Sequence, residues 1–124
     1  MTAKVCVAGA ALLLALAVIT GAFGAHAMRG RLAADMLAVW HTAVQYHFYH
    51  GLGLLAVGVL MTAWGDIGAL RVAAWLLVAG VVLFSGSLYL LAASGLRQLG
   101  AVAPVGGVAF IAAWLAVGWA AWAR

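Results

Sequence analysis

Four long runs of apolar residues, separated by short polar connections, make up nearly the whole chain. The runs cover residues 5–25, 40–63, 72–92 and 102–123. A helix needs about 20 apolar residues to cross the hydrocarbon core of a bilayer. Each run has that length. The pattern therefore predicts an all-α integral membrane protein, a four-transmembrane-helix bundle with short loops that forms one membrane domain over residues 1–124.

The connections between the runs predict how the helices are joined. The first, residues 28–39, holds Arg29, Arg31 and Asp35, and we expect it to contain an interfacial turn of helix. The second is a tight turn at residues 65–68, and the third, residues 94–100, has glycines near both ends, which is a helix stop-and-restart pattern. With four spans, both termini and the second connection share one membrane face, here called face A. The other two connections lie on face B.

The first run also has features of a secretory signal peptide. Lys4 precedes the apolar stretch, and Ala25-His26-Ala27 at its end resembles a cleavage site. The apolar stretch is about 20 residues, however, and signal peptides usually carry 7–15. A retained helix is the favoured interpretation. Cleavage is the alternative, and it would leave three spans with the termini on opposite faces.

Composition places the chain in the bilayer and excludes nucleic acid as a partner. Hydrophobic residues make up 69% and charged residues 6% of the sequence, whereas soluble domains carry about 25% charged residues. The net charge of +4 comes from six scattered basic residues, without the clustered patch of a nucleic-acid-binding protein. The membrane orientation stays open, because three basic residues fall on each predicted face: Lys4, Arg71 and Arg124 on face A, and Arg29, Arg31 and Arg97 on face B.

The two halves of the predicted bundle differ in chemistry. Tryptophans mark the face A ends of the helices, as in the aromatic belt of membrane proteins, at positions Trp64, Trp75, Trp119 and Trp122. Polar side chains gather in the face B half instead, at His26, His41, Thr42, Gln45, Tyr46, His47, Tyr49, His50, Ser85, Ser87, Tyr89, Ser94, Arg97 and Gln98. Any functional site is therefore expected in the face B half.

The second run carries a polar stripe. On a wheel of 100° per residue, the side chains from His41 through Gln45 and Tyr49 to His50 form one face, whereas Trp40 and His47 lie off it. His50 follows Trp40 by ten residues, which places it near the middle of the hydrocarbon core. Polar groups at this depth must find partners, so we expect the stripe to face the bundle interior.

Serines of the third run are the predicted partners of this stripe. Ser85 lies about nine residues before the face B end of its helix, at a depth comparable to that of His50. We therefore predict a hydrogen bond between Ser85 and His50, or between Ser87 and Tyr49. Interhelical hydrogen bonds of this kind contribute about 0.6 kcal/mol each on average.

These positions suggest a half-open site at face B that binds a lipid headgroup or a small polar or anionic ligand. Its candidate residues are His26, Gln45, Tyr46, Tyr49, His50, Ser85, Ser87, Tyr89 and Arg97. Two alternatives stay open. The chain could be a structural or accessory subunit that packs as a homo-oligomer or within a larger membrane complex. It could also bind a metal through His47 and His50, although no carboxylate or cysteine accompanies them in the membrane.

The sequence offers little for catalysis, and we predict no cofactor and no enzymatic activity. Both acidic residues lie in loops, and no nucleophile, base and acid come together in the usual pattern. Cys6 is the one cysteine, so it cannot form an internal disulfide and is expected to be a buried thiol. A bis-histidine haem needs two histidines at one depth, a condition that His26 and His50 do not meet.

Four segments resemble, in order, the signatures of a known family. They read GAFGAHA at residues 21–27, WHTAVQYHFYHGLG at 40–53, FSGSLY at 84–89 and PVGG at 104–107. Together they are similar to the domain-of-unknown-function 423 family, the transmembrane protein 256-like small membrane proteins. The resemblance implies a multi-pass protein of the bacterial cytoplasmic (inner) membrane and implies no catalytic residues. His47 and Ala103 depart from the pattern, where Gln and Thr are expected, which speaks against His47 as a shared ligand.

Overall fold

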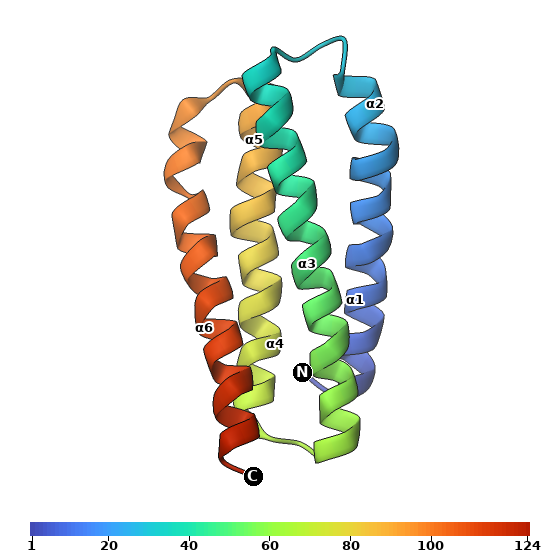
Figure 1. The fold of residues 1–124 in the computed structure, drawn as a ribbon, viewed down its shortest axis with the longest axis vertical. Coiled ribbons are helices and arrows are strands. Elements are labelled where there is room, and N and C mark those ends of the chain that lie inside the picture. Colours follow the sequence, from blue (N-terminus) through green and yellow to red (C-terminus); the bar gives the residue numbers. More distant parts are fainter.

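The computed structural model describes every residue from 1 to 124 and consists of four helical columns joined by short connections. The first column contains α1 (Ala3–Val18), η1 (Ile19–Gly24) and α2 (Ala25–Met28); the second is α3 (Ala34–Trp64); the third contains α4 (Gly68–Gly80), η2 (Val81–Gly86) and α5 (Ser87–Ser94); the fourth contains η3 (Arg97–Ala101) and α6 (Ala103–Trp122). The columns run antiparallel to their neighbours, and both termini lie at the lower end in Figure 1. That end corresponds to face A.

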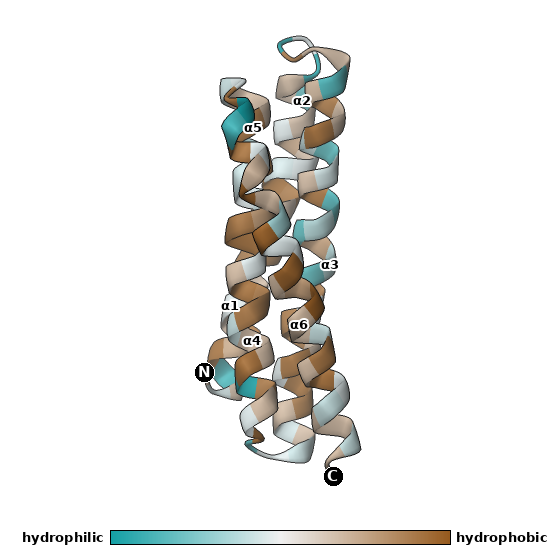
Figure 2. Cartoon of the chain, turned by 90° about the vertical axis from the view of Figure 1, so that its left-hand side faces the viewer, coloured by the Kyte–Doolittle hydropathy of each residue, from teal (hydrophilic) through white to brown (hydrophobic).

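Three of the columns have the length and apolar composition of membrane spans. They cover Ala3–Met28, Gly68–Ser94 and Arg97–Trp122. The remaining column, α3, is 31 residues long and is more polar in its first half. Figure 2 shows hydrophilic positions recurring along the upper half of α3, whereas the lower half of the bundle is almost entirely apolar. The predicted contrast between the two halves is therefore confirmed.

Two turns form where the sequence predicts them. α3 ends at Trp64 and α4 begins at Gly68. Between them, Gly65 has a φ of 87°, and Gly95, which follows α5, has a φ of 72°. Glycine adopts this left-handed region without steric penalty and is common just past a helix end. These glycines allow the chain to reverse within a few residues.

The first connection is shorter than predicted. α3 begins at Ala34, so residues 34–39 of the predicted connection are helical, as expected, but they are continuous with α3, and only residues 29–33 join α2 to α3. The predicted boundary followed hydropathy, which marks the hydrocarbon core and not the end of a helix. Asp35 in the first turn carries a negative charge where the helix dipole favours it. The helix therefore extends beyond the apolar run.

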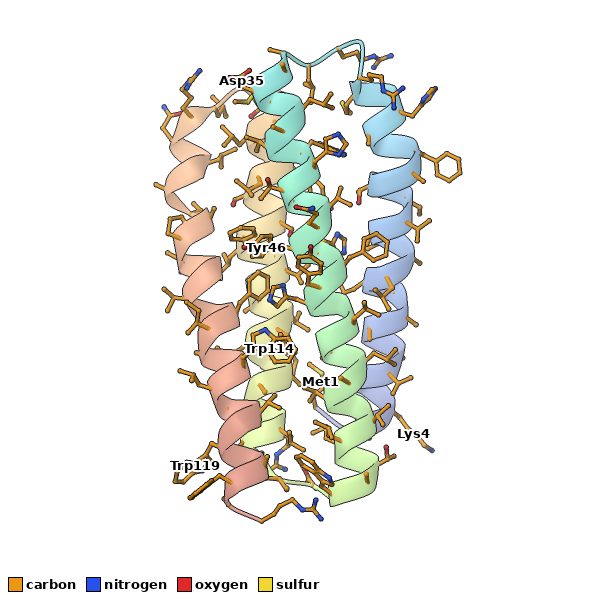
Figure 3. The ribbon with its side chains drawn as sticks, viewed as in Figure 1. Met1, Lys4, Asp35, Tyr46, Trp114 and Trp119 are labelled. Carbon is orange, nitrogen blue, oxygen red and sulfur yellow. The ribbon has the colours of Figure 1, made fainter.

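A dry core fills the half of the bundle near face A. Leu54, Leu70 and Leu77 are fully buried there, and small side chains such as Ala10 let the helices approach closely. Cys6 is also fully buried, with its Sγ 3.6 Å from the Sδ of Met61, which confirms the predicted buried thiol. At this end, side chains such as Trp119 point outward from the bundle (Figure 3).

Candidate functional site

Two of the columns contain a π-helical turn in the polar half of the bundle. η1 interrupts the first column and η2 interrupts the third. Such turns are rare and are frequently found at functional sites. At η1, the Thr20 carbonyl accepts a hydrogen bond from the Ala25 N–H and another from Nε1 of Trp40, which lies 3.0 Å away. The Thr20 carbonyl in the π turn therefore forms a hydrogen bond that links the first column to α3.

A partly buried hydrogen-bonded chain joins three columns next to this contact. Nδ1 of His47 lies 3.0 Å from the Tyr89 hydroxyl, which lies 3.0 Å from the Thr20 hydroxyl. The Thr20 hydroxyl in turn lies 3.0 Å from the Leu16 carbonyl. A carbonyl only accepts, so Thr20 donates to Leu16, Tyr89 donates to Thr20, and His47 donates from Nδ1 to Tyr89. This order assigns the His47 proton to Nδ1.

The other nitrogen of His47 has no partner. Nε2 is buried and makes no hydrogen bond, and the Leu13 carbonyl of α1 lies near the ring but outside hydrogen-bonding geometry. The side chain is only 4% exposed. Tyr89 is consequently the one side chain that satisfies this histidine, and it also packs its ring against Trp40, with ring centroids 4.8 Å apart.

His50 occupies a separate, aromatic environment between α3 and α6. Nδ1 of His50 donates to the Tyr46 carbonyl over 2.7 Å, so its proton is assigned to Nδ1. The ring stacks on Phe110 with centroids 3.4 Å apart and planes 8° apart. The Tyr46 ring lies beside His50, with centroids 5.8 Å apart, and the Trp114 ring lies 6.1 Å away. Figure 3 shows Tyr46 and Trp114 lying between the two helices. His50 thus faces the bundle interior, as the sequence predicts.

The predicted serine partners were wrong. Ser85 is fully buried, but its hydroxyl donates to the Ala43 carbonyl of α3 over 2.7 Å and not to His50. Ser87 donates to the Phe84 carbonyl in its own column over 2.9 Å. A short serine side chain reaches a neighbouring backbone more easily than a ring two turns away. Ser85 therefore joins the third column to α3 through the backbone, whereas the hydrogen bond of Ser87 stays within its own column.

The orientation predicted for the polar stripe was also wrong. His41, Gln45 and Tyr49 are exposed on the outside of the bundle, and Tyr49 is 56% exposed. The buried side of α3 instead carries Trp40, Ala43, His47, His50, Gly51, Gly53, Leu54, Val57, Gly58 and Met61. Small and aromatic side chains pack on the neighbouring columns at closer range than a row of long polar ones. The part of the stripe formed by His41, Gln45 and Tyr49 therefore faces away from the other helices, whereas His50, at its edge, is buried.

The remaining predicted site residues do not gather around one space. Tyr46 is 38% exposed at the α3–α6 junction, while His26 and Arg97 are exposed at the face B end. The expected cavity among these residues is not there, because the rings of Tyr46, Phe84 and Phe110 fill the space beside His50. Two cavities exist, and both lie at the opposite end, around Ala3.

The structure does not assemble a metal site from the candidate histidines. No group of three or more His, Cys, Asp or Glu side chains is placed to hold a metal ion. His47 bonds to Tyr89, whereas His50 bonds to the backbone of its own helix. The His47 ring therefore hydrogen-bonds to the third column, whereas the His50 ring hydrogen-bonds within α3.

Sequence reasoning missed Thr20 and Trp40 as site residues and named His47 only as a possible metal ligand. Trp40 and His47 lie off the polar stripe, and their spacing of seven residues gives them nearly the same angle on the α3 wheel. That shared angle was the available signal, since it coincides with the buried side of α3. Nothing in the composition around Thr20 indicates a π turn, so the hydrogen bond from Trp40 to the Thr20 carbonyl could not be predicted.

Comparison with known proteins identifies a matching family model and several similar membrane proteins. A family model described as "Protein of unknown function (DUF423)" matches residues 20–107. UPF0382 membrane protein YwdK of Bacillus subtilis is 52% identical over 102 residues, covering 82% of this chain and 83% of the relative. UPF0382 membrane protein SH2409 of Staphylococcus haemolyticus is 51% identical over 98 residues, covering 77% of each chain. No solved structure matches.

The matched region contains the π turns, the His47–Tyr89–Thr20 chain and the polar stripe of α3. It also contains the four segments that resemble the family signatures in the sequence, so that prediction is confirmed. With its long apolar helices, the chain is an integral membrane protein that belongs to the DUF423 family.

Proposed function

We propose that all four columns cross the bilayer and that the protein is an association module, in which two copies pair through the outward face of α3. This face is defined by His41, Gln45, Tyr49, Leu52 and Ala56. The observation that carries the proposal is the exposure of two polar side chains, Gln45 and Tyr49, near the middle of a membrane bundle.

The length and neighbours of α3 support a fourth span. Its 31 residues extend about 46 Å, more than the hydrocarbon core of about 30 Å. α3 packs on α1 on one side and on α4 and α5 on the other, so it shares their depth (Figure 1). Its deepest buried polar groups, on His47 and His50, each find a partner inside the bundle.

The polar groups of the outward face have no partner within the chain. The side chains of this half of α3 that form hydrogen bonds are Trp40, Thr42, His47 and His50. Tyr49 is the middle residue of α3, and Gln45 lies about 6 Å from it along the axis. Lipid tails offer no hydrogen bonds, so polar groups at this depth normally face protein or a water-filled cavity.

A second copy of the chain is the partner that fits this face. Both copies insert to the same depth, so a two-fold axis along the membrane normal brings Gln45 opposite Gln45. An amide both donates and accepts, as does the Tyr49 hydroxyl, and a two-fold interface requires such self-complementary groups. Leu52, 52% exposed, and Ala56 continue the face as an apolar packing surface.

Replacement of the central amide tests the proposal. In Gln45→Leu we expect about a tenfold rise in the dimer dissociation constant, because an interhelical hydrogen bond is worth about 0.6–1.7 kcal/mol and the pair can form two. The measurement is the oligomeric state of the full chain in lipid discs over a range of protein-to-lipid ratios. Gln98→Leu is the matched control, since it removes the other exposed glutamine, in η3.

Two results would exclude this function. The first is a wild-type chain that stays monomeric at every protein-to-lipid ratio. The second is an equal loss of dimer in Gln45→Leu and Gln98→Leu, which would show that association does not use the outward face of α3.

A further inference from the structure

We propose that a groove on the outside of α1, at face A, binds an anionic phospholipid, with the phosphate at Lys4 and an acyl chain along the alanines. The groove has a volume of about 360 Å³ and is lined by Ala3, Lys4, Val7, Ala8, Ala11 and Thr62. That volume lies within the range of small-molecule sites, about 300–1,000 Å³. The site is separate from the outward face of α3 and does not depend on dimer formation.

The groove has an apolar wall and one charged end. From Ala3 to Ala11, the α1 side runs about 12 Å toward the membrane interior. Thr62 closes the groove from α3, and its hydroxyl is already used by the Val59 carbonyl, 2.7 Å away. Within the membrane, the wall therefore offers only apolar contacts, which suit a hydrocarbon chain.

The charged end is a free ammonium group at the level of the lipid headgroups. Lys4 lies at the lower end of α1 and points away from the bundle in Figure 3. The single ion pair of the structure joins Arg71 to Asp66 over 3.0 Å, so Lys4 has no carboxylate partner.

The apolar wall and the Lys4 ammonium group together suit an anionic phospholipid. Basic residues at the membrane surface attract anionic headgroups, and a long lysine side chain can keep its charge in the headgroup layer while its methylenes follow apolar surface. A phospholipid carries both groups that the groove would contact, a phosphate and an acyl chain. Inorganic phosphate would occupy only the lysine, and another helix would leave the ammonium group unpaired.

The test compares phosphatidylglycerol with phosphatidylcholine of the same acyl chains, bound to the full chain in detergent and counted by native mass spectrometry. We expect the wild type to retain phosphatidylglycerol preferentially. Lys4→Gln should reduce this preference about fivefold, the effect of one basic residue at an anionic surface. Ala8→Leu, which fills the groove, should lower the binding of both lipids. Arg124→Gln and Ala121→Leu are the controls, because both positions are exposed at the same membrane face but lie at the end of the fourth column, outside the groove, and both variants should bind lipid like the wild type.

Three outcomes would overturn the proposal. They are equal retention of both lipids by the wild type, an unchanged preference in Lys4→Gln, and displacement of the lipid by millimolar inorganic phosphate alone. A change of oligomeric state in Ala8→Leu with lipid binding intact would likewise overturn it, because the groove would then be a protein interface. Helix content and thermal unfolding, measured for each variant, separate loss of the site from loss of the fold.

Discussion

Gly106→Val is expected to destabilise the bundle by more than about 3 kcal/mol, because the fourth column has no space for a side chain where it crosses η2. A Cβ at Gly106 would lie 2.7 Å from Cβ and 2.8 Å from Cα of Phe84, and closer still to the Phe84 nitrogen. Overpacking costs about 1–3 kcal/mol where side chains can shift, and more where the obstacle is backbone. Unfolding of the purified protein by heat or by SDS, followed by helix content, measures the loss.

The neighbouring glycine provides a matched control. A Cβ at Gly107 would meet only Cδ2 of Phe84, at the ordinary contact distance of 3.9 Å. We therefore expect Gly107→Val to change stability by less than about 1 kcal/mol, in line with an ordinary surface substitution. Equal losses in the two variants would mean that α6 does not approach η2 as closely as described.

Tyr89→Phe is expected to destabilise the protein by about 1–2 kcal/mol, although it removes a single oxygen. The Tyr89 hydroxyl takes part in two hydrogen bonds, one to His47 and one to Thr20. Without it, His47 has no partner at either nitrogen while staying buried. An unsatisfied buried polar group costs about 1–3 kcal/mol, whereas interhelical hydrogen bonds in membranes average about 0.6 kcal/mol. The expected loss lies between these limits.

A double-mutant cycle separates this hydrogen bond from simple packing. In a His47→Leu background, Tyr89→Phe should cost about 0.6 kcal/mol less than in the wild type, because no buried nitrogen is then left unpaired. His47→Gln should keep most of the coupling, since an amide can also donate to the Tyr89 hydroxyl. Additive effects in the cycle would show that His47 and Tyr89 do not interact.

The sequence predicts the four helices and their turns because both follow from local rules. Runs of about 20 apolar residues mark bilayer crossings, and the glycines at 65 and 95 supply the left-handed conformation that ends a helix. The positions of the tryptophans at face A also follow from local sequence, because an indole ring prefers the headgroup level of the membrane. Each of these features depends on one segment and on the solvent around it.

The details of the site depend on contacts between segments and could not be read from one segment alone. The stripe from His41 to Tyr49 was correctly grouped, but its direction is set by how closely Gly51 and Gly58 let α1 approach the other side of α3. Thr20 gains a second donor only because Trp40 reaches it from another column. His47 lies off the polar stripe on the helical wheel, and it is buried because it is on the side of α3 that packs on the other columns.

The central claim is that α3 meets a second copy through its outward face, and cysteine cross-linking in native membranes tests it most directly. Cys6→Ala first removes the single native thiol, and Gln45→Cys then adds one at the centre of the face. Leu115→Cys serves as the control, because Leu115 is 70% exposed on α6 and away from that face. A disulfide requires Cα atoms within about 7 Å, so only a specific contact forms it efficiently. The account predicts a disulfide-linked dimer with Gln45→Cys and little with Leu115→Cys; equal cross-linking in both variants, or none with Gln45→Cys, would contradict it.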